Sequence, residues 1–395
     1  MDDFTILSYP GARDSSLLSL NENRSKYMLP FGGRFRVVDF TIRNSIDSGA
    51  RRTIIFNNCE DDLAAYVEHY GPFKGKRQPP IRVISRSRTD IRFCHNLVTE
   101  SNTRYYVIYN GDNPSIIDFR EMIERYKKKR SPAMLFTLKH TGKASMAYTM
   151  LVADRKSLLS AIDSAVEEER HAPNLFEMII NMMINRGIRR EAMNAHYWPI
   201  RSIPDYYLFN MGVMEHKELF SFMYGGSSLK GFIRGEGFAV VGPEARIVRS
   251  YISDSCKING AVQNSIIFPC VEIGERAVIK DSIILPYNRI GAGARITRTV
   301  IDESSPMVKE DPQAQDAPSP RPLHIGDRCY IGSDDEQLKN SDFPRSIYGS
   351  ITLIGKDCEI PEASRIGGAC YVASGKGREY FSKSKYLYDG TSLVK

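Results

Sequence analysis

The chain has 395 residues, of which 42% are hydrophobic, and it carries a formal net charge of +7 with a pI near 8.9. This length predicts two domains, because single hydrophobic cores seldom grow beyond about 250 to 300 residues. We expect no membrane span, because no run approaches the roughly 18 to 20 apolar residues that a span needs. The chain starts with Met1, Asp2 and Asp3, which is acidic where a secretion signal is basic, so we expect a cytoplasmic protein.

The cysteines and the basic residues exclude two further classes of protein. The seven cysteines are scattered without any Cys-x-x-Cys pair, which favours reduced thiols over disulfides or a zinc site. The basic run 127–130 follows an acidic stretch and is typical of a helix end, where cations interact favourably with the helix dipole. No basic motif with interleaved aromatic residues occurs, so we expect no nucleic-acid partner and favour small phosphorylated ligands.

The first part of the chain alternates short apolar runs with helical patterns. Strands are predicted over 52–56, 81–85, 105–109 and 133–138, and helices over 61–70, 118–129, 157–169 and 175–186. This alternation predicts a largely parallel sheet of a Rossmann-like α/β domain, over residues 1–235. Ligands of such sheets bind beyond the carboxyl ends of the strands, which places Asn57, Asn58, Gly111 and Asp112 at the mouth of a site.

After about residue 235 the pattern becomes a repeat. Aliphatic residues recur mostly five or six positions apart, and Ile267, Ile284 and Ile301 are separated by 17 residues, so that every third step closes one coil. This is the hexapeptide repeat of a left-handed parallel β-helix, predicted over residues 236–395. The full series is Ile247, Ile252, Ile258, Val262, Ile267, Ile273, Ile279, Ile284, Ile290, Ile296 and Ile301.

A polar segment interrupts the repeat. Residues 302–322 are rich in Ser, Pro, Asp, Gln and Lys, which predicts a flexible loop without a packed core. The repeat resumes at His324 and again at Leu353, and the polar stretch 337–342 between them extends the insert. We therefore expect a flexible insert near residues 303–345.

The segment 11–16 has the place of a phosphate-binding loop but lacks most of its chemistry. Such a loop needs glycines, so that backbone N–H groups approach the anion, and cations that neutralise the charge. Here Asp14 stands inside the loop, and its carboxylate would repel a phosphate. The sequence thus predicts a nucleotide-binding fold whose reaction is lost.

The order of these parts resembles the ADP-glucose pyrophosphorylases, the glucose-1-phosphate adenylyltransferases of glycogen biosynthesis. The resemblance covers nearly the whole chain: it includes the Phe-Gly-Gly-Arg-Phe-Arg segment 31–36, the strand ending in Gly111-Asp112, Ser145-Met146 and the tail 380–394. It implies a nucleotidyltransferase fold and a reaction that joins ATP and glucose 1-phosphate and expels pyrophosphate. Positioning, cations and Mg²⁺ carry such a reaction, with little covalent chemistry.

Several functional positions of the family are altered in this chain. At the family's catalytic arginine stands Ser16, the second metal-binding acid is replaced by Pro199 or Ile200, and the base-binding segment becomes 88–92 with Arg88 in place of a glycine. The loop with the Glu-Lys pair that grips the sugar phosphate is shortened to residues 140–144. The positions kept are the first metal-binding acid Asp112 and the lysine Lys26.

The resemblance distributes the remaining candidate residues among four roles. The nucleotide side comprises Gly11, Arg13, Lys26, Asn57, Asn58 and Asp112; the sugar-phosphate side Lys143 and Ser145; the metal position Asp112; and the effector side Arg24 and Arg36. The alternative for Arg24, Lys26 and Arg36 is that they pair with carboxylates such as Asp39 or Asp47. Asn23 stands where the family has another effector-binding lysine.

Three functions remain open from the sequence. The first is a regulatory, catalytically degenerate subunit that joins an intact catalytic paralogue in a hetero-tetramer, or forms a homo-oligomer, and responds to a small phosphorylated effector or nucleotide. The second is an active or slow adenylyltransferase that uses Mg²⁺, Asp112, Lys26 and a substitute acid such as Asp205. The third is a hexapeptide-repeat scaffold or acyltransferase, which would want a histidine beside a coil; His324 is interpreted as a solvated loop residue.

Overall fold

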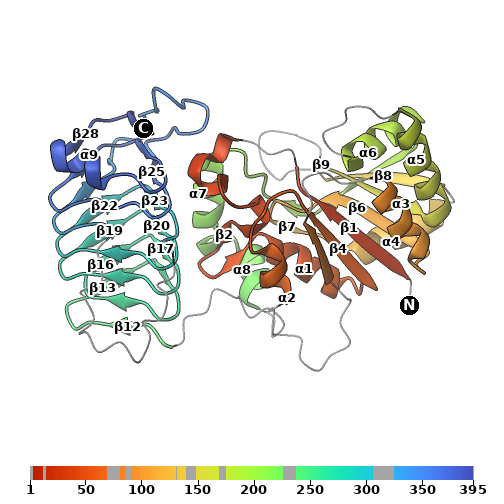
Figure 1. The fold of residues 1–395 in the computed structure, drawn as a ribbon. Helices are drawn as coiled ribbons and strands as arrows, with labels where there is room; N and C mark the ends of the chain where they lie inside the picture. Colours follow the sequence, from red (N-terminus) through yellow and green to blue (C-terminus); the bar gives the residue numbers. More distant parts are fainter. Residues whose placement is uncertain are drawn as a thin grey trace, which may run out of the picture.

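The computed structural model describes residues 3–11, 15–68, 81–85, 91–129, 131–138, 148–168, 175–225, 237–305 and 324–394. Figure 1 shows an α/β part and a column of stacked coils lying side by side, with α7 (Ile203–Met211) between them. The predicted fold class, a Rossmann-like sheet followed by hexapeptide coils, is confirmed. The expected boundary at 235/236 lies in residues 226–236, outside the described residues, and stays a prediction.

The α/β part is built on a seven-stranded sheet with the order β10-β8-β9-β6-β1-β4-β5. The strands are β1 (Phe4–Tyr9), β4 (Arg52–Asn57), β5 (Ile81–Ser85), β6 (Tyr105–Asn110), β8 (Ala133–Leu138), β9 (Tyr148–Asp154) and β10 (Arg189–Met193). Neighbouring strands are parallel except where β9 runs antiparallel to β6 and β8. The largely parallel sheet predicted from the sequence is thereby confirmed.

Strand β1 lies inside the sheet, between β6 and β4, although the sequence patterns did not predict it. All six of its residues are buried, and two of them are polar. Thr5 and Ser8 can be buried because their hydroxyl groups form hydrogen bonds, Thr5 with Thr103 at 2.9 Å and Ser8 with Tyr27 at 2.8 Å. A strand buried on both faces shows no alternation of polar and apolar residues, so its periodicity gives little signal.

Helices cover both faces of this sheet. Leu7 of β1 packs with α3 (Ile91–Glu100), α5 (Arg155–Glu168) and α6 (Leu175–Asn185). On the other face, Ile6 packs with α4 (Phe119–Lys129), while Ile55 of β4 packs with α1 (Val38–Asp47) and α2 (Leu63–Glu68). The predicted helices α2, α4, α5 and α6 are confirmed, with ends shifted by one or two residues. The last two residues predicted for α2, 69–70, lie outside the described residues.

Shorter elements connect the sheet to the coils. These are η1 (Ser15–Asn21), η2 (Lys26–Met28), β2 (Pro30–Phe31), β3 (Phe35–Arg36), β7 (Ser115–Ile116), β11 (His196–Tyr197), η4 (Gly212–Met214) and α8 (Lys217–Tyr224). The turn between β2 and β3 contains Gly33 at φ 91°, and a Cβ there would lie 2.4 Å from the ring of Tyr251 in the first coils. Glycine at this position therefore lets the β2–β3 hairpin approach the coils closely.

The coils stack as three parallel sheets. Their orders are β12-β15-β18-β21, β13-β16-β19-β22-β24-β26-β28 and β14-β17-β20-β23-β25-β27-β29. The strands are β12 (Val240–Val241), β13 (Arg246–Val248), β14 (Tyr251–Ile252), β15 (Lys257–Ile258), β16 (Ala261–Gln263), β17 (Ile266–Ile267), β18 (Glu272–Ile273), β19 (Val278–Lys280), β20 (Ile283–Ile284), β21 (Arg289–Ile290), β22 (Arg295–Thr297), β23 (Thr299–Ile301), β24 (Tyr330–Ile331), β25 (Thr352–Ile354), β26 (Arg365–Ile366), β27 (Tyr371–Val372), β28 (Tyr386–Leu387) and β29 (Ser392–Leu393). The 17-residue spacing is confirmed, because Ile267 pairs with Ile284 and Ile284 with Ile301.

The predicted aliphatic series is buried except in the first coil. Residues from Ile258 to Ile301 in the series are at most 2% exposed, whereas Ile247 is 38% exposed and Ile252 is half-buried. The first coil has a neighbouring coil on one side only, so its aliphatic side chains stay partly accessible to solvent. The other end of the column bears α9 (Arg378–Lys383).

The predicted insert near 303–345 is packed at both of its ends. Residues 306–323 lie outside the described residues. Asp302 is 1% exposed, and the side chain of Glu303 is 14% exposed. In the stretch 337–342, Asn340 is buried and donates hydrogen bonds to the carbonyl groups of Ala369 and Thr391. Polar composition was misleading in these places because the polar side chains have buried partners from distant parts of the chain.

One hydrophobic core joins the α/β part to the coils. It combines Leu17 and Phe31 of the first part, Tyr206 of α7, and Ile266 and Leu353 of the coils. Hydrogen bonds add to this contact: the hydroxyl of Tyr207 donates to the carbonyl of Asp281 at 2.7 Å, and Ile203 N–H donates to the carbonyl of Ser346 at 3.1 Å. The two parts are therefore held together by a continuous apolar contact with polar bonds at its edge.

Candidate functional site

The carboxyl ends of β1, β4 and β6 meet at one edge of the sheet. Because these three strands are adjacent and parallel, the residues after them, including Gly11 and Asp112, are brought together. Gly111 is required at this edge, since a Cβ there would lie 2.0 Å from Ser8 Oγ and 2.7 Å from Thr41 Oγ1. The backbone thus turns directly over a layer of buried hydroxyl groups.

That layer of hydroxyl groups fixes the turn at Gly111 and Asp112. Tyr109 donates to Thr41 Oγ1 at 2.8 Å, and Thr41 donates to the carbonyl of Gly111 at 3.3 Å. Burial raises the pKa of Tyr27 and of Tyr109, so both phenols stay neutral and keep their O–H groups for hydrogen bonding. The site therefore rests on a rigid, uncharged base.

Asp112 is the central charged group of this edge, and its oxygens are engaged inside the protein. Gly11 N–H donates to Oδ2 at 2.7 Å, and Asn113 Nδ2 donates to Oδ1 at 2.7 Å. Lys26 Nζ lies 3.8 Å from Oδ1. Asp112 is 3% exposed. The backbone N–H of Gly11 thus donates its hydrogen bond to the Asp112 carboxylate, whereas a phosphate-binding loop would present this N–H to its ligand.

Lys26 and residue 200 are tied into the same cluster through Asn113. Asn113 Oδ1 accepts hydrogen bonds from Lys26 Nζ at 3.1 Å and from Ile200 N–H at 2.8 Å. The β7–β11 pair and the bond from Trp198 N–H to the carbonyl of Pro114 hold this segment in place. Ile200 is 1% exposed, and its side chain belongs to the core between the two parts of the molecule. The position therefore contributes an apolar side chain to packing.

These residues fit a two-carboxylate Mg²⁺ site poorly. Asp112 keeps both oxygens in hydrogen bonds, and position 200 offers no oxygen ligand from its side chain. The substitute Asp205 serves the start of α7, where Oδ2 accepts from Arg201 N–H at 3.0 Å and its N–H donates to Ser202 Oγ at 3.2 Å. Among the described residues, no group of three or more His, Cys, Asp or Glu side chains is arranged to hold a metal ion.

Glu177 is a charged neighbour of Asp112 that the sequence analysis missed. Phe176 on α6 stacks on Tyr9 with ring centroids 5.4 Å apart, which brings the start of this helix to the end of β1. Burial raises the pKa of Glu177, and the charge of Asp112 raises it further. The pKa of Tyr9 is raised by burial, then by Glu177 and Asp112. Glu177 is the one charged residue in an otherwise uncharged helix, Leu175–Asn185, and that isolation was a usable signal.

The remaining predicted residues of the nucleotide and sugar sides divide into two groups. Asn57 is buried, and its amide donates to the carbonyl of Cys59 at 2.9 Å and to Asp61 Oδ1 at 2.7 Å, whereas Asn58 is exposed. Arg13, Lys143, Ser145 and the segment 88–90 lie outside the described residues. The structure thus brings together Gly11, Lys26 and Asp112, and the roles proposed for the nucleotide and sugar residues stay predictions.

The two predicted effector residues lie away from Asp112, where the α/β part meets the coils. Arg24 is 8% exposed and pairs with Asp302 at 2.5 Å and Glu303 at 2.7 Å, while Arg36 pairs with Glu303 at 3.2 Å. The alternative expectation, that these arginines pair with carboxylates, agrees with the structure, but the partners are Asp302 and Glu303 and not Asp39 or Asp47. Asp39 accepts from the backbone N–H of Arg36, and Asp47 pairs with Arg43.

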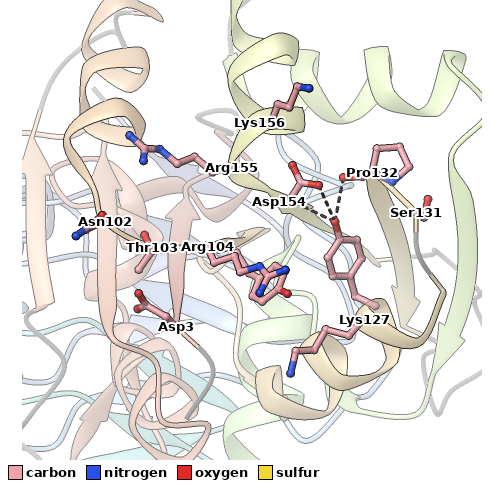
Figure 2. Close-up of a pocket in the computed structure, with 12 residues that line it drawn as sticks. Asp3, Asn102, Thr103, Arg104, Lys127, Ser131, Pro132, Asp154, Arg155 and Lys156 are labelled. Carbon is pink, nitrogen blue, oxygen red and sulfur yellow. Dashed lines mark hydrogen bonds between the residues drawn. The ribbon is translucent and has the colours of Figure 1, made fainter.

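A separate hollow of about 720 Å³ lies at the opposite edge of the sheet, near the starts of β6 and β8 (Figure 2). Its charged lining includes Arg104, Lys127, Lys156 and Asp154. Tyr126 donates from its hydroxyl to the carbonyl of Pro132 and to Asp154, as the dashed lines of Figure 2 show. The hollow contains none of the residues predicted for nucleotide, sugar or metal, so its size does not mark it as their site.

His324 lies in the coils and is not the solvated residue that the sequence suggested. The ring nitrogen Nδ1 of His324 accepts a hydrogen bond from the backbone N–H of Arg289 at 3.1 Å, and the backbone N–H of His324 donates to the carbonyl of Arg289. Burial lowers the pKa of the imidazole. With Nδ1 occupied in this way, His324 serves the coil structure. No described helix has the length and apolar character of a membrane span.

Comparison with known proteins agrees with this architecture. Residues 238–312 match the family model described as GlmU-like, C-terminal hexapeptide. The glucose-1-phosphate adenylyltransferase of Acetivibrio thermocellus is 20% identical over 92% of this chain and 92% of its own length. That of Thermomicrobium roseum is 23% identical over 93% and 92%, and glucose-1-phosphate adenylyltransferase 2 of Vibrio cholerae is 21% identical over 84% and 97%.

The fold and the comparisons together define a sugar nucleotidyltransferase type of protein, with an α/β sheet followed by hexapeptide coils. Within that class, the chain is similar over most of its length to glucose-1-phosphate adenylyltransferases. At identities of 20–23%, these relatives leave open whether this chain is catalytic or regulatory.

Proposed function

We propose that this chain is a regulatory, catalytically degenerate subunit of glucose-1-phosphate adenylyltransferase that acts in glycogen biosynthesis in the cytoplasm. The reaction of the assembled enzyme would convert ATP and glucose 1-phosphate to ADP-glucose and pyrophosphate. The partner would be an intact catalytic paralogue, in a hetero-tetramer. In this proposal the chain contributes to assembly and to the response of the partner, while the partner supplies the chemistry.

The observation that carries the proposal is the closed cluster around Asp112. The N–H of Gly11 is bonded to a protein carboxylate, so a phosphate there would have to displace Asp112 and would be repelled by it. The resemblance places the family's second acid at Pro199 or Ile200, neither of which is acidic, and Ile200 packs in the core. Transition-state stabilisation in phosphoryl and nucleotidyl transfer depends on aligned donors and cations, so losing both phosphate contacts and an acid removes most of the catalytic advantage.

A second candidate, a slow adenylyltransferase, is favoured by one observation. Glu177 lies near enough to Asp112 for the charge of Asp112 to raise its pKa, so a second carboxylate exists at this edge although it comes from an unexpected helix. If this edge still bound nucleotide, Glu177 and Asp112 would be the two acids that approach it. This candidate, and not the first, requires turnover by the isolated chain with Mg²⁺.

The two candidates separate in one assay of pyrophosphate release. The purified chain is supplied with ATP, glucose 1-phosphate and Mg²⁺, alone and mixed with a catalytic paralogue from the same source. The regulatory proposal expects no turnover alone and a changed rate or effector response of the paralogue in the mixture. Turnover alone that is lost in Asp112→Asn and Glu177→Gln would establish the slow enzyme.

Assembly is tested apart from activity. Sedimentation of the chain, the paralogue and their mixture should reveal a complex larger than either component. This is expected because the subunits of a closed oligomer associate through complementary surfaces. The isosteric variant Asp112→Asn should associate and modulate the paralogue as the wild type does. A mixture in which the components sediment independently would exclude the subunit role, whatever the chain does alone.

A further inference from the structure

A cavity of about 210 Å³ lies where the α/β part meets the coils. Arg24 and Arg36 approach it from the segments around η2 and β3, and Glu303 and Lys356 approach it from the coils. Since a water molecule occupies about 30 Å³ of liquid, this volume is large enough for a phosphate-sized anion. The Asp112 cluster is a separate place, so the properties of this cavity do not depend on whether the chain is catalytic.

Glu303 stands at the centre of the cations that line this cavity. Its Oε1 lies 2.7 Å from Arg24 Nη1, and its Oε2 accepts a hydrogen bond from Arg36 Nη2 at 3.2 Å. Burial alone would raise the pKa of Glu303, but the charges of Arg24, Arg36 and Lys356 outweigh burial and lower that pKa to about 2. Glu303 is therefore ionised at neutral pH and neutralises the cationic wall from inside the protein.

The two arginines keep donor capacity that Glu303 does not use. Arg24 Nη1, although close to Glu303, and Arg36 Nε are buried, and neither finds a hydrogen-bond acceptor of suitable geometry among the described residues. A carboxylate has two oxygens, whereas a phosphate group presents more acceptors in three dimensions. Guanidinium groups bind phosphate in a fork-like geometry that suits such spare donors.

The acidic neighbours of the cavity limit what else could fill it. Asp61 is committed to other groups, because its Oδ2 accepts from Ser25 N–H at 2.6 Å and its Oδ1 from Asn57 at 2.7 Å. Glu60 and Asp62 also line the cavity and are exposed. With Glu303 in place, the carboxylates among the described residues of the lining outnumber the cations there, so an incoming anion meets net repulsion from them.

We propose that Glu303 is an internal counter-anion that excludes small phosphate-type anions from this cavity, and that removal of its charge converts the cavity into a phosphate-binding site. Loss of that charge leaves Arg24, Arg36 and Lys356 short of one neutralising group in a partly desolvated space. Arg24 keeps its ion pair with Asp302, whereas Arg36 loses the carboxylate with which it pairs. A largely buried cation without its counter-ion is unfavourable, and an external anion relieves this cost. The residue at position 303 thus decides whether the junction between the two parts responds to phosphorylated compounds.

The test compares wild type with Glu303→Gln, which keeps the size of the side chain and removes its charge. Inorganic phosphate and pyrophosphate are titrated at constant ionic strength, and binding is followed by calorimetry and by the midpoint of thermal unfolding. Ligand that binds only the folded state raises this midpoint, so both readouts report the same affinity. We expect Glu303→Gln to bind phosphate about tenfold or more tightly than wild type.

Two controls assign the effect to this cavity. Glu272→Gln removes a carboxylate that also bridges two cations, Lys257 at 3.1 Å and Arg289 at 2.9 Å, but on the surface of the coils, and it should leave phosphate affinity unchanged. Adding Arg36→Gln to Glu303→Gln should abolish the gained binding. If Glu303→Gln does not fold, Glu303→Asp, whose shorter carboxylate reaches the arginines less well, should show a smaller gain. Phosphate affinity equal in wild type and in the folded Glu303 variant would overturn the proposal.

Discussion

Asp112 and Glu303 are both carboxylates surrounded by donors, but their donors come from different distances along the chain. Asp112 is bonded by groups that one sheet brings together, whereas Glu303 contacts Arg36, which is 267 positions away, across two parts of the molecule. The first cluster fills the edge where ligands of α/β sheets bind, and the second fixes the coils against the sheet. Changes at Asp112 should therefore affect local ionisation and chemistry, and changes around Glu303 should affect stability and anion response.

The largest effect is expected from Arg24→Met. This change leaves Asp302, which is 1% exposed, without the guanidinium 2.5 Å from its Oδ1. Breaking a buried pair by removing one partner typically costs about 3–5 kcal/mol, because the remaining charge stays buried and uncompensated. Urea unfolding should show a loss of this size in the free energy of unfolding.

Arg328→Met is the matched control for that measurement. Arg328 pairs with Glu362 at 3.3 Å, and both side chains are about two-thirds exposed. Exposed pairs contribute little, so the loss should stay below about 1 kcal/mol. Equal losses in the two variants would mean that the junction between the two parts gains nothing from its buried charges.

The next effect is a dependence of stability on pH that comes from Glu303. Its pKa is lowered from 4.5 to about 2 in the folded state, so its contribution is present above pH 4.5 and is lost as the pH falls toward 2. A shift of this size corresponds to roughly 3 kcal/mol. The difference in unfolding free energy between wild type and Glu303→Gln should be largest at pH 6 and should shrink progressively as the pH falls toward 2.

Asp302 makes this comparison between two proteins necessary. Burial raises the pKa of Asp302, and the neighbouring Arg24 guanidinium opposes that shift. A raised carboxyl pKa contributes in the opposite direction, because protonation then favours the folded state. An acid unfolding curve of wild type alone would mix the two groups. A difference between the two proteins that does not change between pH 6 and pH 3 would refute the role assigned to Glu303.

A smaller loss is expected where the backbone of the candidate site turns. In Gly111→Ala the new methyl group would meet Ser8 Oγ at 2.0 Å and Thr41 Oγ1 at 2.7 Å, which forces the hydroxyl layer apart at a cost of about 1–3 kcal/mol. Gly237→Ala is the control, since the nearest atom to its Cβ would be Ser255 Oγ at 3.9 Å. Thermal unfolding of both variants should show a lower midpoint only for Gly111→Ala.

The sequence predicted those features that depend on local periodicity. The 17-residue spacing of Ile267, Ile284 and Ile301 identified the coils because every coil repeats the same inward position. It could not predict that Glu303 meets Arg24, because a polar segment carries no mark of a partner 279 positions earlier. Polar composition instead suggested a flexible loop there.

The candidate site was predictable to a similar degree. The chain order of β4 and β6 indicated the edge at which Asp112 lies, because parallel strands end on the same side. The hydrogen bond from Gly11 to Asp112 depends on β1, which lacked the alternation that sequence patterns detect. Glu177 required the tertiary contact of Phe176 with Tyr9 to bring it to that edge.

The smallest expected effect concerns the ionisation of Glu177. Burial and the charge of Asp112 together raise the pKa of Glu177, so Asp112→Asn should lower that pKa by removing the second contribution while burial keeps it above its ordinary value. The side-chain carboxyl resonance of Glu177, followed by NMR during a pH titration, measures this directly. Asp118→Asn, at an exposed position before α4, is the control and should leave the titration unchanged. An unchanged Glu177 titration in Asp112→Asn would mean that the charge of Asp112 does not affect the ionisation of Glu177. That result would remove the observation that favours a slow enzyme.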